Sequence, residues 1–284
     1  KPCSISSRCA AGMTRPPSPP AGSTSDVQAN RIPGYPCYRT VEATLVDAQQ
    51  LAQDYPRLAT WQDIGDSREK YARLGGYDIV ALRLTNRDVP GPKPVLLLTA
   101  AMHAREYATA ELAMRFAESL VRGYGKDADA TWILDYHEIH AILHVNPDGR
   151  KLAETGLSWR KNTNQAYCDP QSAMRGADLN RNFDFQWACC NGSSASECAW
   201  DYRGPAAASE PEVQALQGYM ATIFADRRDL GLENAAPLDA NGIYIDVHSY
   251  GELVLWPWGH TSDLAPNATQ LQTLGRKMAY WNDY

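Results

Sequence analysis

The chain has 284 residues, 44% of them hydrophobic and 21% charged, which is enough to bury a sizeable core in one large domain. Its net charge of −6, from 33 acidic and 27 basic residues, argues against a nucleic-acid partner, because such a partner requires a basic surface. The longest apolar run, Val95 to Ala101, is too short to cross a bilayer. We therefore expect a monomer that acts on small molecules or peptides, not on nucleic acid or membranes.

Seven cysteines are many for a reducing compartment, and all fall in loop-like sequence rich in Pro, Gly or Ser. This pattern predicts disulfides and a secreted or periplasmic protein, whereas buried inert thiols would be the alternative in a reducing compartment. The odd number leaves one cysteine without a partner in the sequence given. The seven are Cys3, Cys9, Cys37, Cys168, Cys189, Cys190 and Cys198.

Residues 1–34 are rich in Pro, Ser, Gly and Ala and show neither a helical nor a strand period, so they predict an extended N-terminal arm. Cys3 and Cys9 could tie this arm to the body of the protein. From Tyr35 the pattern changes, and residues 35–284 are expected to form the folded domain.

Helical and strand patterns alternate in this domain. Helices are predicted at Val41–Tyr55, at Thr109–Tyr124 and from about Ser209, and strands at Tyr77–Leu84, Val95–Ala101, His137–Val145 and Ile243–Val247, with a surface loop over Ala188–Ala208 and a further apolar run at Leu253–Trp256. The fully apolar strands are typical of buried strands in parallel or mixed sheets. The order predicts an α/β fold with a mixed, mostly parallel central sheet sandwiched between helices.

A candidate metal site follows two of these strands. His103 and Glu106 come directly after Val95–Ala101, and His248 directly follows Ile243–Val247. An isolated His-x-x-Glu motif is weak evidence for a metal site, because a glutamate at a helix N-terminus beside a locally bonded histidine explains it equally well. The third residue changes the interpretation, since a catalytic zinc site has three protein ligands and an open position.

The remaining histidines and one acidic residue are secondary candidates. Asp246 lies two residues before His248 on the same strand face, so its carboxylate could orient the imidazole. The other histidines are interpreted as structural or surface groups: His137, His140, His144 and His260.

Three arginines lie in the segments around these residues. Arg105 is inside the His-x-x-Glu turn, Arg160 follows Trp159, and Arg181 follows Asn180. A salt-bridged surface loop is the default explanation of any single arginine. Three near one metal indicate instead an anionic substrate terminus or a developing oxyanion.

Five short motifs together resemble a known family. They are His-Ala-Arg-Glu at 103–106, Asn-Pro-Asp-Gly at 146–149, Trp-Arg-Lys at 159–161, Asp-Leu-Asn-Arg-Asn at 178–182 and His-Ser-Tyr at 248–250. In order and spacing they resemble the funnelin zinc carboxypeptidases, the carboxypeptidase A/B family, from about Tyr35 to the last residue. The segments around Trp187 and Tyr202 are more similar to bacterial secreted members such as carboxypeptidase T.

The resemblance implies a role for each matching residue and a catalytic domain over 35–284. One Zn²⁺ would be held by His103, Glu106 and His248 and would activate water for hydrolysis of the C-terminal peptide bond of peptides or proteins. The resemblance further implies that Arg160 stabilises the oxyanion, that Asn180 and Arg181 bind the substrate's terminal carboxylate, and that Arg105 and Tyr250 line outer subsites.

The family's general-base glutamate is expected beyond Tyr284, so we expect the C-terminal part of the fold to be missing from this sequence. Glu252 is not a favoured substitute. A naturally short pseudoenzyme that binds peptide or zinc is one alternative, and a peptidase acting on peptidoglycan stem peptides is another, which the Asn180–Arg181 pair disfavours. Gly259 stands where the carboxypeptidase E/N branch is expected to place an acid to grip basic side chains, so that branch is disfavoured. A broad or hydrophobic specificity is expected.

Overall fold

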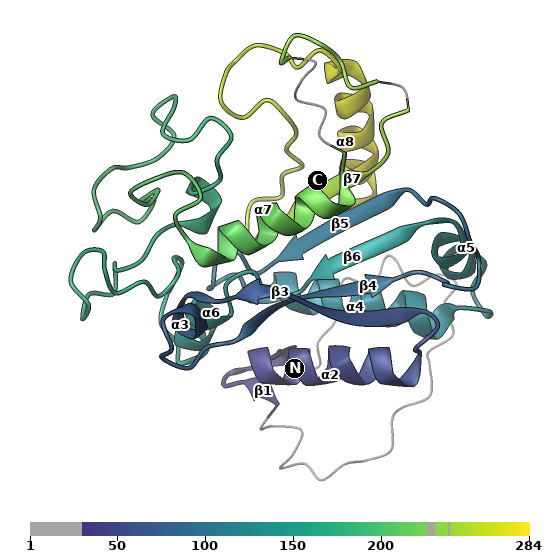
Figure 1. Cartoon of the computed structure of the whole chain (residues 1–284), viewed down its shortest axis with the longest axis horizontal. Helices are drawn as coiled ribbons and strands as arrows, with labels where there is room; N and C mark the ends of the chain where they lie inside the picture. The colour runs from purple at the N-terminus through teal and green to yellow at the C-terminus, as the bar shows by residue number, and fades with distance from the viewer. Residues whose placement is uncertain (1–29, 226–230, 238) are drawn as a thin grey trace.

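A five-stranded sheet forms the centre of the computed structural model, which describes residues 30–225, 231–237 and 239–284 (Figure 1). The strands lie in the order β3 (Ala59–Asp66), β4 (Asp78–Leu84), β6 (Glu138–Ile142), β5 (Val95–Ala100) and β7 (Ile243–Val247). β4 is antiparallel to both of its neighbours, whereas β5 is parallel to β6 and to β7. Four of the five strands therefore point the same way, as the predicted mixed and mostly parallel sheet requires.

Helices cover both faces of this sheet. In Figure 1, α7 lies across one face, and α2, α4 and α5 lie on the other. The helices are α2 (Val41–Asp54), α3 (Arg68–Tyr71), α4 (Tyr107–Gly123), α5 (Ala128–Tyr136), α6 (Pro147–Glu154), the short 3₁₀ helix η1 (Leu179–Arg181), α7 (Pro211–Ile223) and α8 (Ala268–Asn282). None of the helices in the described ranges is both long and apolar enough to span a membrane.

The two faces of the central strands carry separate hydrophobic cores. Leu98 of β5 packs in the core formed with α2, α4 and α5, whereas the preceding Leu97 packs in the core formed with α7. Successive side chains of a strand point to opposite faces, so a strand buried on both sides must be apolar at every position. This explains the continuous apolar run of β5.

The predicted bounds differ from the structure mainly at the ends of elements. β6 is shorter than His137–Val145, because after Ile142 the chain turns toward Asn146, which caps α6. α4 begins at Tyr107 and not at Thr109, because Glu106 already occupies its N-cap position. β3, α3, α5, α6 and α8 were not predicted from the sequence.

The apolar run of β7 does not produce the predicted buried strand. β7 is the last strand in the sheet and pairs with β5 alone among the described strands. Ile243 and Tyr244 are consequently 45% and 38% exposed. The following apolar run is also open to solvent, with Leu253 at 67% and Leu255 at 82%. An apolar sequence indicates burial only where another element covers it.

Disulfides occur in the long segment between α6 and α7, as the cysteine pattern predicts. Cys168 is bonded to Cys198, and Cys189 is bonded to Cys190. Cys37 is also disulfide-bonded. It lies in β2 (Tyr35–Arg39), which pairs with β1 (Arg31–Ile32). The predicted arm, with Cys3 and Cys9, lies outside the described residues over 1–29, so its conformation stays a prediction.

A buried acidic pair at the start of α7 links this helix to the segment after α6. The carboxylate of Glu210 accepts hydrogen bonds from the side-chain amides of Asn162 and Asn164, at 2.8 and 2.9 Å. Glu212 accepts a 2.8 Å hydrogen bond from the backbone N–H of Arg68. Burial, assisted by the neighbouring charge of Glu210, raises the pKa of Glu212 to about 8.

Replacement of Glu212 by Gln should change how stability depends on pH. Glu212 keeps its proton in the folded state up to about pH 8 but loses it in the unfolded state near its ordinary pKa of 4.5. Folding therefore takes up a proton in this window, and the free energy of unfolding falls as pH rises. Relative to Glu212→Gln, the wild type should lose on the order of 1 kcal/mol per pH unit between pH 5 and 8 in denaturant titrations. If the free energy of unfolding changed with pH in the same way in both proteins, the raised pKa of Glu212 would be contradicted.

Candidate metal centre

The turn between β5 and α4 places His103 and Glu106 at the carboxyl edge of the sheet. Both side chains are nearly buried, with 4% and 7% of the residue surface exposed. His248 directly follows β7, and the parallel register sets Val247 opposite Ala100 at the ends of the two strands. Residues far apart in sequence thus meet at one edge, where α/β proteins bind ligands.

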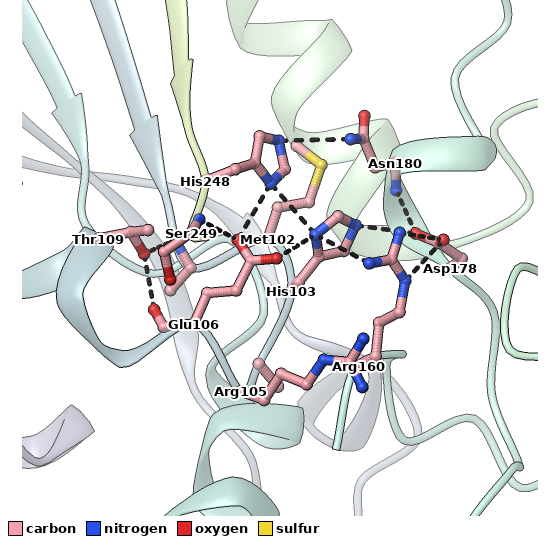
Figure 2. Close-up of polar contacts among 12 residues, drawn as sticks. Met102, His103, Arg105, Glu106, Thr109, Arg160, Asp178, Asn180, His248 and Ser249 are labelled. Atoms are coloured by element: carbon pink, nitrogen blue, oxygen red, sulfur yellow. Dashed lines mark hydrogen bonds and ion pairs between the residues drawn. The ribbon is translucent and has the colours of Figure 1, made fainter. Parts of the chain in front are cut away.

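The two imidazoles and the carboxylate of the three predicted ligands come together (Figure 2). His103 Nδ1 lies 2.8 Å from Glu106 Oε1 and 3.1 Å from His248 Nδ1, and the latter lies 3.1 Å from Glu106 Oε2. Zinc bonds of ~2.0–2.1 Å at tetrahedral angles separate neighbouring ligand atoms by about 3.3 Å. The triangle therefore fits a small tetrahedral cation with only slight expansion. The His248 side chain remains 33% exposed, which leaves one side of the site open.

A carboxylate lies beside the second nitrogen of each imidazole. His248 Nε2 is 2.6 Å from Asp246 Oδ2, in the arrangement expected from the sequence. His103 Nε2 is 3.3 Å from Asp178 Oδ1, within ion-pair reach although not aligned as a hydrogen bond. Such carboxylates fix the orientation of ligand imidazoles and increase their basicity. Asp178 was not predicted as a site residue, although it opens the Asp-Leu-Asn-Arg-Asn motif.

Contacts within the cluster shift the pKa values of its acidic and basic groups in opposite directions. Burial would raise the pKa of Glu106, but hydrogen bonds to His103, His248 and the Ser249 N–H outweigh it and lower the pKa to about 2. Burial would lower the pKa of His248, but its contacts with Asp246 and Glu106 raise it to about 10. The two carboxylates therefore hold a positive charge between them, which is also what a metal-binding pocket does.

Arg160 extends this cluster on the side of His103. Its Nε and Nη2 donate to Asp178 Oδ2 at 3.0 and 2.8 Å, and its Nη1 lies 3.4 Å from His103 Nδ1. The opposite side of the guanidinium packs over the ring of Trp200, at 4.8 Å from the centroid. Burial tends to raise the pKa of Asp178, but the contact with His103 and the positive charges of Arg160 and Arg181 keep it below its ordinary value. Arg160 is thus fixed beside the three donors.

Asn180 and Arg181 lie on η1, next to the same cluster. Asn180 Nδ2 is 3.3 Å from His248 Nε2. Arg181 donates through Nε to the Gly192 carbonyl and through Nη1 to the Asn180 carbonyl, both at 2.9 Å. Both residues line an open pocket of about 380 Å³. Its other lining residues are Phe183, Phe185, Gln186, Trp187, Ala188, Cys189, Cys190, Gly192, Ser193, Gly259 and His260.

The remaining predicted site residues stand apart from the cluster. Arg105 is exposed and donates to Ser158 Oγ at 3.3 Å. The ring of Tyr250 is fully exposed. Their assignment to outer subsites stays a prediction. His260, interpreted from sequence as a structural or surface group, lines the pocket of Arg181.

Comparison with known proteins assigns the family. The zinc carboxypeptidase family model matches residues 45–282, which is most of the chain. The chain is 34% identical over 259 residues to a zinc carboxypeptidase of Saccharothrix mutabilis subsp. capreolus, covering 88% of this chain and 55% of that protein. It is also 30% identical over 253 residues to carboxypeptidase B of Helicoverpa zea, covering 88% and 53%. This protein therefore belongs to the zinc carboxypeptidase family.

Solved structures agree with this assignment. Carboxypeptidase A from Helicoverpa armigera superposes with a TM-score of 0.69 at 27% identity, covering 85% of this chain and 53% of that one. Thrombin-activatable fibrinolysis inhibitor gives a TM-score of 0.71 at 24% identity, covering 89% and 60%, which supports the fold. The chain spans about half the length of the curated relatives it matches. The particular similarity to carboxypeptidase T stays a prediction.

Removing the charge of Asp178 should weaken metal binding. Asp178→Asn keeps the shape of the side chain but removes the carboxylate that faces His103 and holds Arg160, so zinc affinity should fall about 10- to 100-fold in a chelator competition assay. Asp135→Asn is the matched control, because Asp135 accepts hydrogen bonds from Asn86 and Tyr124, away from the cluster. Equal zinc affinities of Asp178→Asn and Asp135→Asn would show that the Asp178 carboxylate does not support metal binding.

Proposed function

We propose that this protein is a zinc-dependent metallocarboxypeptidase that removes residues from the C-termini of peptides or proteins. The observation that carries the proposal is the triangle of His103, Glu106 and His248, with Arg160 and Asn180 in contact with its imidazoles. Family membership supports the reaction class. Because the chain spans about half of its curated relatives, the activity of those longer proteins is carried over here as a proposal.

A Zn²⁺ bound to these three residues would supply Lewis-acid polarisation of the scissile carbonyl and activation of a water molecule. The protein supplies the remaining charge stabilisation. Arg160 is held from behind by Asp178, so its guanidinium is already oriented when negative charge develops on the carbonyl oxygen. Donors that need no reorganisation during the reaction are the most effective.

The terminal carboxylate of a substrate would bind to Asn180 and Arg181. Arg181 is fixed by two backbone carbonyls, and a guanidinium has five N–H donors, so donors remain for a carboxylate. The adjoining pocket contains Phe183, Phe185 and Trp187 and would accept the C-terminal side chain. This aromatic lining supports a preference for apolar C-terminal residues.

The disulfides support a secreted or periplasmic location. The bond between Cys168 and Cys198 joins residues 30 positions apart in the segment that carries Arg181. Such bonds persist in oxidising compartments and are rare in the cytosol. Extracellular peptides with free C-termini are the expected substrates.

Binding of zinc and peptide without turnover is the second candidate function. Glu106, Asp178 and Asp246 are each engaged with imidazole or guanidinium groups of the cluster, so none of them is free to act as a general base. Glu252, the next acidic residue after His248, is exposed. Turnover of a peptide by the zinc-loaded 284-residue chain distinguishes the two functions.

The metal assignment predicts one zinc per chain, lost on removal of a ligand. His248→Ala deletes one corner of the triangle and should reduce bound zinc to a small fraction of stoichiometric, as measured by elemental analysis after dialysis. His137→Ala is the control, because His137 packs on Trp132 away from the cluster and should retain one zinc. Stoichiometric zinc in His248→Ala would overturn the ligand set.

The carboxylate assignment predicts that Arg181 recognises the free C-terminus. Arg181→Ala should weaken binding of C-terminally free peptides about 10- to 100-fold, measured as Kd or KM, because a charge-assisted hydrogen bond contributes about 1.5–3 kcal/mol. The binding of C-terminally amidated peptides should weaken only slightly. Arg175→Ala serves as the control, since Arg175 packs on Trp159. Equal losses of binding for free and amidated peptides would show that Arg181 does not bind the terminal carboxylate.

A further inference from the structure

The turn that carries His103 and Glu106 is irregular, and its conformation must be held by other parts of the molecule. It begins after Ala101, which has a positive φ of 54°. Two of its amides are paired with carbonyls: Glu106 N donates to His103 O at 3.1 Å, and Ala104 N donates to Arg160 O at 3.2 Å. Backbone carbonyls in such a buried turn also need donors.

Those donors come from Arg150, in α6. Its Nη1 donates to the carbonyls of Ala104 and Glu106, at 3.4 and 3.2 Å, and its Nη2 donates to the carbonyl of Tyr107, at 3.0 Å. The guanidinium also lies over the ring of Tyr107, 4.6 Å from its centroid. The Arg150 side chain therefore donates to three backbone carbonyls in the four-residue stretch from Ala104 to Tyr107.

The position of this arginine is unusual in its burial and in its partners. Arg150 is 0% exposed, and burying a guanidinium is costly unless its donors are satisfied. Its ion-pair partner in the structure is Glu154, whose Oε1 is 4.0 Å from Nε and beyond hydrogen-bond distance. Glu154 itself binds the Val41 N–H and Lys151. The carbonyls of the turn, and not a carboxylate, accept the hydrogen bonds of both Nη groups, whereas Nε has no hydrogen-bond partner.

Asn146, four residues earlier, contacts the same turn. Its side-chain amide donates to the Met102 carbonyl at 3.3 Å, and its backbone N–H donates to the Ala101 carbonyl at 3.2 Å. Positions i and i+4 lie on one face of a helix. Asn146 at the N-cap thus holds the carbonyls of Ala101 and Met102, and Arg150 one turn later holds carbonyls between Ala104 and Tyr107.

We propose that Arg150 is a positioning residue of the metal centre, which fixes the turn between β5 and α4 so that His103 Nδ1 and the Glu106 carboxylate keep the spacing required by one cation. The inference rests on the metal site proposed above. A zinc site tolerates displacements of only about 0.5 Å, so loss of three anchoring hydrogen bonds on the turn should reach the ligand atoms.

The experiment compares two buried arginines. Arg150→Met keeps an apolar stem of similar length without the donors, and Arg150→Lys keeps the charge but cannot span three carbonyls. The matched control is Arg39→Met, because Arg39 is 9% exposed and its guanidinium binds Asp47 and Glu118. For each protein, three quantities are measured: zinc Kd by chelator competition, the midpoint of denaturant unfolding, and the visible absorption of the Co²⁺ form.

The Arg150 variants should bind zinc about 10- to 100-fold more weakly than wild type, the range known for residues that orient metal ligands, with Lys less affected than Met. Their Co²⁺ spectra should change, while Arg39→Met should lose stability and keep wild-type zinc affinity and spectrum. Wild-type affinity in the Arg150 variants, or an equal loss in Arg39→Met, would overturn the proposal. If Arg150→Met does not fold, Arg150→Lys decides by the same criteria. A wild type without stoichiometric zinc would instead refute the proposed function itself.

Discussion

The parallel pairing of β5 with β7 is the contact on which the whole site depends. It sets Val247 opposite Ala100, so that the residues just beyond each strand meet although His103 and His248 are far apart in the sequence. Side chains alternate between the two faces of a sheet, and a shift of one residue in this register would turn the imidazole of His248 to the other face. No local sequence feature could compensate for such a shift.

Asp178 connects the candidate metal ligand His103 to the proposed oxyanion donor Arg160 and the candidate substrate-binding residue Asn180. Its carboxylate faces His103, holds the guanidinium of Arg160 and accepts the backbone N–H of Asn180 at 3.1 Å. The side chain is fully buried, and this low-polarity environment strengthens each of these interactions. A displacement of this one carboxylate would therefore move the candidate ligand His103, the proposed oxyanion donor Arg160 and the segment proposed to bind the terminal carboxylate together.

The sequence predicted those features that depend on local pattern. Apolar runs followed by His103 and His248 located two strands and the candidate ligands after them, because a strand buried on both faces leaves no position for polar residues until it ends. Features set by distant contacts were not predictable. The polar β3 is a strand because β4 pairs with it, and β7 is half exposed because it is the edge of the described sheet. Likewise, nothing local to Arg150 shows that its partners are carbonyls some 45 residues earlier.

The three candidate ligands are held with very different rigidity. His103 and Glu106 are buried, and α6 and Asp178 fix their turn from several sides. His248 follows an edge strand and keeps a third of its side-chain surface exposed, with Asp246 as its closest polar contact. A ligand that binds only the native arrangement stabilises it by mass action. A cation bridging these donors would thus link His248, at the end of β7, to the buried turn, so the docking of β7 in this arrangement and the affinity for metal are coupled properties of this fold.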